Sequence, residues 1–161
     1  MTPSSATKTL TVAAILLASL TLGGCSAITT LLNGEGDVFS LEVGDCMDDF
    51  GTADDITTVP IVDCDEKHDA EVYATEDIDA DSYPGASEVS DEADEICIDA
   101  YEDFVGLAYE DSLLNYTALT PSEDSWALGD KEVVCMISKY DENGGLVKVS
   151  DSLEGLSLIH I

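Results

Sequence analysis

Cysteine is the residue type that most constrains how this chain folds, because its chemistry depends on the compartment that holds it. The N-terminus indicates that compartment. A single cation, Lys8, precedes an uncharged and mostly apolar run of 14 residues from Thr9 to Leu22, and the small residues Gly23 and Gly24 follow. Such a run is too short to cross a bilayer as a helix, which takes roughly 20 residues. The layout is typical of an export signal, so we expect the rest of the chain to lie outside the cytoplasm.

The first of the 5 cysteines, Cys25, directly follows this run, and Leu22-Gly23-Gly24-Cys25 is similar to a bacterial lipobox. The lipoprotein pathway attaches a diacylglycerol to such a thiol, cleaves before it and often acylates the new amine, for example with palmitate. More than one acyl chain is needed because a single chain binds a membrane only marginally. We therefore expect residues 1–24 to be a lipoprotein signal peptide and residues 25–37 to hold the lipidated Cys25 and a tether. The alternatives are a plain secretory signal with an incidental cysteine, or an uncleaved apolar start.

The expected mature chain is strongly acidic. Cleavage leaves 137 residues, enough for one domain, and removes Lys8, so that the net charge of −30 becomes −31, with 35 acids and no Arg. Nucleic acid is excluded as a partner because its binding requires cations that neutralise phosphates. An anionic membrane would repel the domain, so the lipid is the expected attachment to the cell membrane. The acids are spread along the chain, which favours a solvated or salt-adapted surface over cation binding.

Four cysteines remain after Cys25, namely Cys46, Cys64, Cys97 and Cys135. Outside the cytoplasm they indicate two disulfides, for which three connectivities are possible. Cys97 is expected beside the buried stripe of a helix and Cys135 inside a strand, whereas Cys46 and Cys64 each follow a predicted strand. These positions favour the pairs Cys46–Cys64 and Cys97–Cys135.

The apolar patterning predicts several strands and one main helix. The helix begins near Ser87 and ends at Gly106, and its expected buried stripe is Val89, Ala93, Ile96, Ala100 and Phe104. Alternation and β-branched residues predict strands at 38–43, 56–62, 71–75, 116–119, 132–140 and 146–149, with a tight Asn143-Gly144 turn before the last. Most turns are too short for parallel crossovers. We therefore expect an α+β fold in which one main helix packs on one face of a mostly antiparallel sheet.

Short motifs stand in a fixed order along the chain. They are Gly44-Asp45-Cys46, Val59-Pro60, Cys64, His68 to Val72, Tyr83-Pro84-Gly85, the helix with Cys97, Pro121-Ser122, Ser125-Trp126-Ala127, Gly129-Asp130 and Cys135. Together they resemble the septum formation domain of actinobacterial envelope proteins over residues 38–155. Lys67 stands where the family often has Pro, and Lys131 where Arg is usual. The resemblance implies a role in division-septum formation without implying any chemical activity.

Three residues are candidates for ligand binding. His68 and Glu71 can line a pocket or a pH-responsive contact, but the alternative is a turn histidine tied to a neighbouring carboxylate, with Glu71 facing solvent. Trp126, the single tryptophan, is either a binding anchor or a core residue over the sheet. The spacing from Cys64 to His68 resembles half of a zinc site, yet no second close pair follows. We therefore expect a disulfide there, with no bound metal and no cofactor.

Calcium binding and hydrolysis of cell-wall glycan are two alternatives to binding of a partner protein. The spacing of Asp77, Asp79, Asp81 and Glu88 matches an EF-hand calcium loop, but Ser82 stands where that loop needs Gly. The sequence contains no Gly-x-Ser-x-Gly elbow, no phosphate-binding glycine loop, no His-Glu-x-x-His and no Cys-x-x-Cys, so we expect no enzyme activity and no catalytic residue. A pair of carboxylates that hydrolyses cell-wall glycan requires no motif and is the enzymatic alternative.

The last 6 residues, Leu156 to Ile161, read LSLIHI, which matches the translation of a common sequencing adapter. We interpret residues 156–161 as an adapter-derived tail, and a genuine final strand is the alternative. The favoured interpretation of the whole chain is a lipid-anchored domain on the extracytoplasmic face, which binds an unknown envelope or division protein without catalysis. A carboxylate hydrolase and a calcium- or pH-responsive module are the alternatives.

Overall fold

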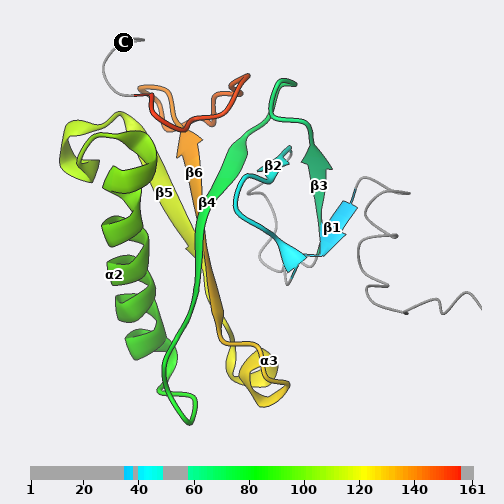
Figure 1. Ribbon diagram of the computed structural model, residues 1–161, viewed down its shortest axis with the longest axis vertical. Coiled ribbons are helices and arrows are strands. Elements are labelled where there is room, and N and C mark those ends of the chain that lie inside the picture. The colour runs from blue at the N-terminus through cyan, green and yellow to red at the C-terminus, as the bar shows by residue number, and fades with distance from the viewer. Residues whose placement is uncertain (1–34, 38–39, 49–57, 157–161) are drawn as a thin grey trace, which may run out of the picture.

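The computed structural model describes residues 35–37, 40–48 and 58–156, and an antiparallel sheet forms its centre (Figure 1). The strands lie in the order β1-β3-β2-β4-β6-β5, and every pairing between neighbours is antiparallel. The elements are β1 (Glu35–Asp37), β2 (Cys46–Met47), β3 (Thr58–Val62), β4 (Ala70–Asp77), α2 (Ala86–Val105), the 3-10 helix η2 (Tyr109–Asp111), β5 (Leu114–Leu119), α3 (Glu123–Ala127) and β6 (Glu132–Lys139). One main helix beside an antiparallel sheet confirms the predicted α+β fold.

Strand β6 is buried on both faces because its neighbours and both core clusters enclose it. Its side chains alternate in the way that a strand requires. Val133, Cys135 and Ile137 point to the face that α2 covers, whereas Val134 and Met136 point to the opposite face. The pairing of β4 with β6 shifts register between Val72 and Ala74, so both Tyr73 and Ala74 contact the larger cluster.

Helix α2 covers one face of the sheet and begins and ends at glycines. Gly85 precedes the helix, and Gly106 ends it in the left-handed conformation (φ 77°), from which its N–H bonds to the Glu102 carbonyl. The predicted buried stripe is confirmed for Val89 and Ala93. Ile96, Ala100 and Phe104 pack against the larger cluster but are only half-buried, because the fully buried line advances by steps of four and passes beside them. Its fully buried members are Val89, Ala93, Cys97, Tyr101 and Val105.

A second, smaller cluster lies on the other face of the sheet. Segment 40–47 and strand β3 cover this face, and the cluster consists of Leu41, Met47, Val59, Ala70, Val72, Val134 and Met136. The alternation along β4 and β6 supplies four of these residues. Both faces of the central strands are therefore shielded from water, one by a helix and one by a short meander.

Two predicted strands are wrong. In the segment 38–43, residues 40–43 form no strand, because the Asp45 carboxylate accepts the Glu42 N–H at 2.9 Å and bends the chain there. The pairing segment is Cys46–Met47 instead, and residues 38 and 39 lie outside the described part. The segment 146–149 forms only isolated bridges, from Leu146 to Tyr140 and from Val149 to His68.

The second error has a local cause. The Asp141 carboxylate accepts the N–H groups of Asn143 at 2.8 Å and of Gly145 at 2.9 Å. These bonds stabilise a loop wider than the two-residue hairpin that Asn143-Gly144 predicts, and they lower the pKa of Asp141. The wide loop directs the following segment away from a ladder with β6 and toward His68.

Three other elements differ from the expectation. The short helix α3 was not predicted, and its capping box joins the side chain and backbone of Ser122 to those of Ser125. Residues 35–37, at the end of the predicted tether, pair with β3 as strand β1. Strand β5 begins at Leu114, two residues before the predicted start.

Both predicted disulfides are present. Cys46 is bonded to Cys64 with a Cα separation of 5.2 Å, and Cys97 is bonded to Cys135 with a Cα separation of 5.5 Å. The second disulfide joins α2 to β6 within the larger cluster. In the part of the chain that the structure describes, no helix is both long and apolar enough to span a membrane.

Candidate functional site: a buried polar group beside a disulfide

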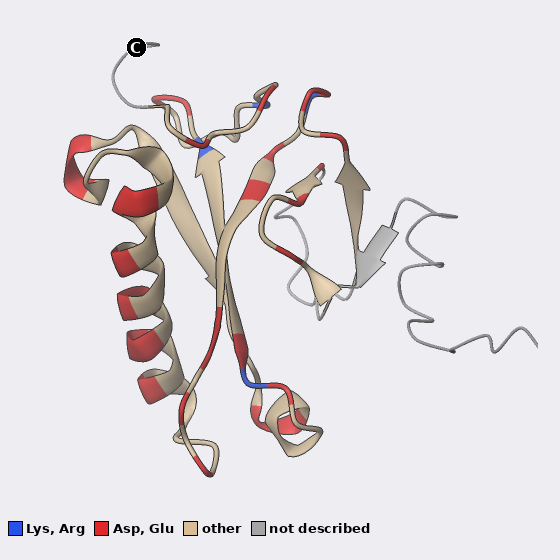
Figure 2. Ribbon diagram, viewed as in Figure 1, with Lys and Arg blue, Asp and Glu red and all other residues tan. Residues whose placement is uncertain are grey.

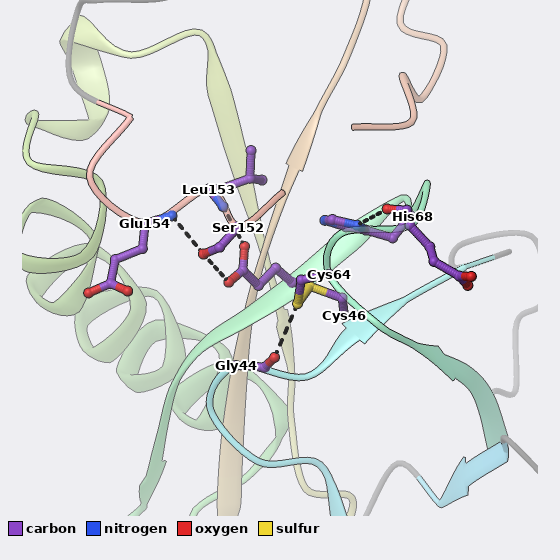
Figure 3. Close-up of a disulfide and its surroundings, with 9 residues drawn as sticks. Gly44, Cys46, Cys64, His68, Ser152, Leu153 and Glu154 are labelled. Carbon is purple, nitrogen blue, oxygen red and sulfur yellow. Dashed lines mark hydrogen bonds between the residues drawn. A yellow bond between two sulfur atoms is a disulfide. The ribbon is translucent and has the colours of Figure 1, made fainter. Parts of the chain in front are cut away.

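The Cys46–Cys64 disulfide lies at the end of the sheet where three separate segments meet. Cys46 in β2 pairs with Glu71 in β4 on one side and with Val62 in β3 on the other. Directly paired residues of antiparallel strands point their side chains to the same face. The register therefore brings the Cys46 sulfur and the Glu71 carboxylate together, and Figure 3 shows the His68 ring beside the disulfide.

His68 is buried, with an exposed fraction of 0%. Its Nδ1 lies 3.0 Å from the Glu66 carbonyl oxygen, and since a carbonyl only accepts, we assign the proton to Nδ1. The other nitrogen, Nε2, then carries the lone pair, and it has no hydrogen-bond partner among the residues that the structure describes. The expectation that a neighbouring carboxylate holds this ring is wrong, because a backbone carbonyl does so.

Glu71 is also buried, with an exposed fraction of 2%, so the expectation that it faces solvent is wrong. Both carboxylate oxygens are bonded, Oε1 to the Ser152 hydroxyl and Oε2 to the Leu153 N–H, each at 2.6 Å (Figure 3). Hydrogen bonds to a charged group are stronger than neutral ones. Glu71 therefore fastens the C-terminal segment onto the sheet, a contact between residues 81 positions apart that sequence patterns do not indicate.

Cys46, His68 and Glu71 each offer one ligand atom, a sulfur, a ring nitrogen and a carboxylate oxygen. These three atoms lie within 4.8 Å of one another. Among the residues that the structure describes, these three form the one group of three or more side chains that are able to ligate a metal ion. The four acids that match a calcium loop in spacing, Asp77, Asp79, Asp81 and Glu88, do not gather in this way.

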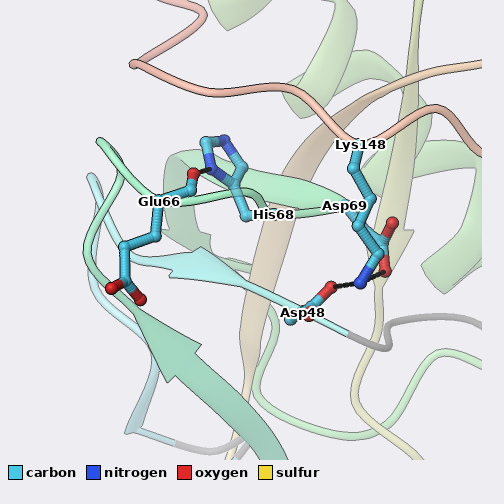
Figure 4. Close-up of polar contacts among 5 residues, drawn as sticks. All are labelled: Asp48, Glu66, His68, Asp69 and Lys148. Atoms are coloured by element: carbon cyan, nitrogen blue, oxygen red, sulfur yellow. Dashed lines mark hydrogen bonds and ion pairs between the residues drawn. The ribbon is translucent and has the colours of Figure 1, made fainter.

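An ion-pair cluster borders the site. Lys148 contacts Asp48, and its ammonium nitrogen lies 3.8 Å from a carboxylate oxygen of Asp69 (Figure 4). Asp69 follows His68 directly, and its backbone N–H donates to the Met47 carbonyl. One cation thus links β2 to the loop before β4.

Trp126 is buried in the larger cluster, with an exposed fraction of 8%. The centroid of its ring lies 5.8 Å from that of Tyr83 and 5.0 Å from the Lys131 ammonium. Lys131 also donates to the Ala80 carbonyl, which ties the loop before α2 to β6. In this structure Trp126 is a core residue with a cation–π contact, and the exposed apolar neighbour is Leu128, at 90%.

Two of the surface hollows formed by the described residues are large enough to receive a side chain. The first, of about 410 Å³, lies between α2 and β5 and is lined in part by Asp94, Tyr109 and Tyr116. The Tyr116 hydroxyl donates to Asp94 at 3.0 Å; burial first, and then this bond, raise the pKa of Tyr116 to about 12. The second hollow, of about 390 Å³, is more apolar, and Leu113 at its rim is 63% exposed. Its apolar lining is Leu107, Leu113, Leu114, Val149 and Leu153, together with Leu156, the first residue of the tail that we interpret as adapter-derived.

One pair of carboxyl groups bears on the hydrolase alternative. Glu132 and Asp77 face each other across β6 and β4. Burial first, and then the charge of Asp77, raise the pKa of Glu132, because both disfavour the ionised form. Neither residue lines either of the two hollows described above.

These features define a small α+β domain with two disulfides, an acidic surface and a polar group buried at one end of its sheet. The family model described as Septum formation matches residues 43–157, and the chain belongs to this family. The resemblance predicted from the motifs is thereby confirmed, and the domain carries a division- or envelope-related role. Comparisons with curated proteins and with solved structures find no match.

Proposed function

We propose that this protein is a lipid-anchored, extracytoplasmic lipoprotein that binds a protein partner at the division septum and performs no catalysis. The observation that carries the proposal is the match of residues 43–157 to the septum formation family. The lipobox at Cys25 supports attachment to the cell membrane. The two disulfides support export, because disulfides persist in oxidising compartments.

The burial of the polar groups supports binding over catalysis. Each Glu71 oxygen is held by a fixed donor, and His68 is enclosed, so neither side chain reaches a large substrate in this conformation. Trp126 is enclosed as well. A macromolecular partner therefore has to contact other residues.

We assign that contact to the apolar hollow beside Leu113. Its walls come from segments around η2 and from the strip 149–153, which Glu71 holds in place. A hollow of this kind accepts an apolar side chain, and a buried apolar anchor at the centre of an interface contributes most of the binding energy.

The charge distribution indicates a basic partner. The outer side of α2 carries a row of acids (Figure 2), of which the exposed members are Glu88, Asp91, Asp94, Glu95, Asp99, Glu102 and Asp103. An acidic face of this kind steers a basic protein surface toward the domain and repels anionic lipid.

The test uses the full chain in cells, with membrane fractionation and immunofluorescence as the two measurements. Wild type should fractionate with membranes and be enriched at septa, whereas Cys25→Ala should leave the membrane fraction. Leu113→Asp should remain on membranes but lose septal enrichment, because a carboxylate at the rim of the hollow opposes burial of the partner's apolar anchor. We expect a cost of about 2 kcal/mol, or roughly 30-fold in affinity.

Leu128→Asp is the matched control, since Leu128 is more exposed than Leu113 and lines neither hollow. It should behave as wild type. Equal loss in both leucine variants contradicts the assigned surface, and uniform distribution of wild type contradicts septal binding. Turnover of purified cell-wall glycan by the full chain contradicts the absence of catalysis.

A further inference from the structure

The most unusual feature of the domain is an unpartnered, buried nitrogen next to a disulfide. His68 Nε2 has no hydrogen-bond partner among the described residues, although the side chain is fully enclosed. A buried polar atom without a partner is destabilising, so such an atom in a native structure requires an explanation.

His68 and Glu71 both have the outer contacts that metal ligands have in proteins. A ligating histidine donates its other ring N–H to a carbonyl or carboxylate, as His68 Nδ1 does to Glu66. A ligating carboxylate is itself held by hydrogen bonds, as Glu71 is by Ser152 and Leu153. Each oxygen retains a further lone pair, so these bonds orient the carboxylate without excluding a metal ion.

The distances fit a small tetrahedral ion after a modest contraction. Zinc binds sulfur at about 2.3 Å and nitrogen or oxygen at about 2.0–2.2 Å, which places ligand atoms roughly 3.5 Å apart. The ligand atoms of Cys46, His68 and Glu71 lie within 4.8 Å of one another. The Cys46 sulfur is held by its bond to Cys64, and cleavage of that bond frees it to turn toward the other two ligands.

We infer that the reduced form of this protein binds Zn²⁺, or a divalent cation of similar softness, through the Cys46 thiolate, His68 Nε2 and a Glu71 carboxylate oxygen. The fourth position is open to Cys64 or to water. A sulfur, nitrogen and oxygen ligand set is one that zinc accepts. In the oxidised form the Cys46 sulfur is bonded to Cys64 and is not available as a thiolate ligand. The metal site therefore exists only in the reduced form.

The conversion requires a dithiol reductant. Two electrons and two protons from that dithiol cleave the bond between the Cys46 and Cys64 sulfurs, leaving two thiols and the reductant as a disulfide. Zn²⁺ then displaces the proton of the Cys46 thiol, so metal uptake releases a proton. Cys64 is only half-buried, which gives the reductant a sulfur to attack.

Two single variants test the site without any reductant. Cys64→Ser and Cys46→Ser remove the same disulfide, and each leaves one thiol at the same place, but only Cys64→Ser retains all three ligands. All proteins in the test also carry Cys25→Ser, because Cys25 is otherwise a second thiol able to bind cobalt. The full chain of each variant is titrated with Co²⁺ without oxygen, and a thiolate-to-cobalt charge-transfer band is the signature of a sulfur ligand. Circular dichroism checks that both variants are folded.

We expect Cys64→Ser to take up one equivalent of Co²⁺ with this band and to release it to Zn²⁺. Cys46→Ser should show no band and at least about tenfold weaker binding. Reduced wild type should behave as Cys64→Ser, oxidised wild type should show no band, and His68→Gln in reduced wild type should weaken binding at least about tenfold. Equal behaviour of the two serine variants, or reduced wild type without the band, overturns the inference.

Discussion

The two disulfides lie in surroundings of opposite character. Cys97 and Cys135 are each 0% exposed and lie among apolar and aromatic side chains between α2 and β6. Cys46 and Cys64 join two short segments at the end of the sheet, beside the buried polar groups of His68 and Glu71. A disulfide in an apolar core contributes to stability alone, whereas a disulfide next to potential ligands also controls what its sulfurs are able to bind.

The two disulfides should contribute unequally to stability. Cys97–Cys135 closes a loop with a sequence separation of 38, and Cys46–Cys64 one with a separation of 18. In the chain-entropy model these loops correspond to about 4 and about 3 kcal/mol. Cys97→Ala/Cys135→Ala should therefore lower the free energy of unfolding more than Cys46→Ala/Cys64→Ala, and lost packing in the larger cluster increases the difference. Chemical denaturation of both double variants measures it, and an equal or reversed order contradicts the comparison.

The second prediction concerns the order of reduction. A dithiol reaches Cys64 in the folded protein, but it reaches Cys97 or Cys135 only after the helix separates from the sheet. Cys46–Cys64 should therefore be reduced at least about tenfold faster, which corresponds to about 1.4 kcal/mol in opening free energy. Alkylation after brief reduction, followed by peptide mapping, identifies the reduced pair. Simultaneous loss of both disulfides shows instead that reduction requires global unfolding.

The smallest expected effect is the contribution of Glu132 to stability, and it contrasts with the well-bonded Glu71 of the same sheet. Glu71, beside Cys46, has a donor on each oxygen, whereas Glu132 faces the like charge of Asp77. Because the pKa of Glu132 is raised in the folded state, that state holds its proton more tightly than the unfolded state does. The tighter binding of this proton stabilises the folded state at low pH. The stabilisation by Glu132 is therefore lost as pH rises from the ordinary glutamate pKa through the raised value.

Glu132→Gln should therefore increase stability near neutral pH by less than about 1 kcal/mol, since solvent screens this half-buried group. Thermal unfolding between about pH 4 and 7 measures the difference, which should vanish at the acidic end. Asp141→Asn is a control of opposite sign, because the pKa of Asp141 is lowered in the folded state. This variant should be less stable than wild type throughout that pH range, since the contribution of Asp141 is lost only below the ordinary aspartate pKa. A decrease in neutral-pH stability in Glu132→Gln contradicts the unfavourable pairing with Asp77.

Local patterns predicted the elements whose side chains repeat along a single segment. Helix α2 and strands β4 and β6 were expected within a few residues of their bounds, because apolar spacing and alternation are properties of the segment itself. Strand β2 and helix α3 were missed, since each is too short for a period to appear. Asp45 and Asp141 changed two predicted strands through side-chain bonds to the backbone, which compete with strand pairing.

The sequence by itself determined the α+β class, the family and the pairing of the cysteines. The fold class and the cysteine pairing depend on the spacing of residues along single segments, and the family depends on short motifs in a fixed order. All of these features can be read from the sequence without knowing the tertiary structure. Only the tertiary structure decided that Cys46, His68 and Glu71 meet and that Glu71 holds the segment at Ser152. The physical reason is strand register: which residues of distant segments face each other depends on how the whole sheet packs, and a shift of one residue would point Glu71 to the opposite face.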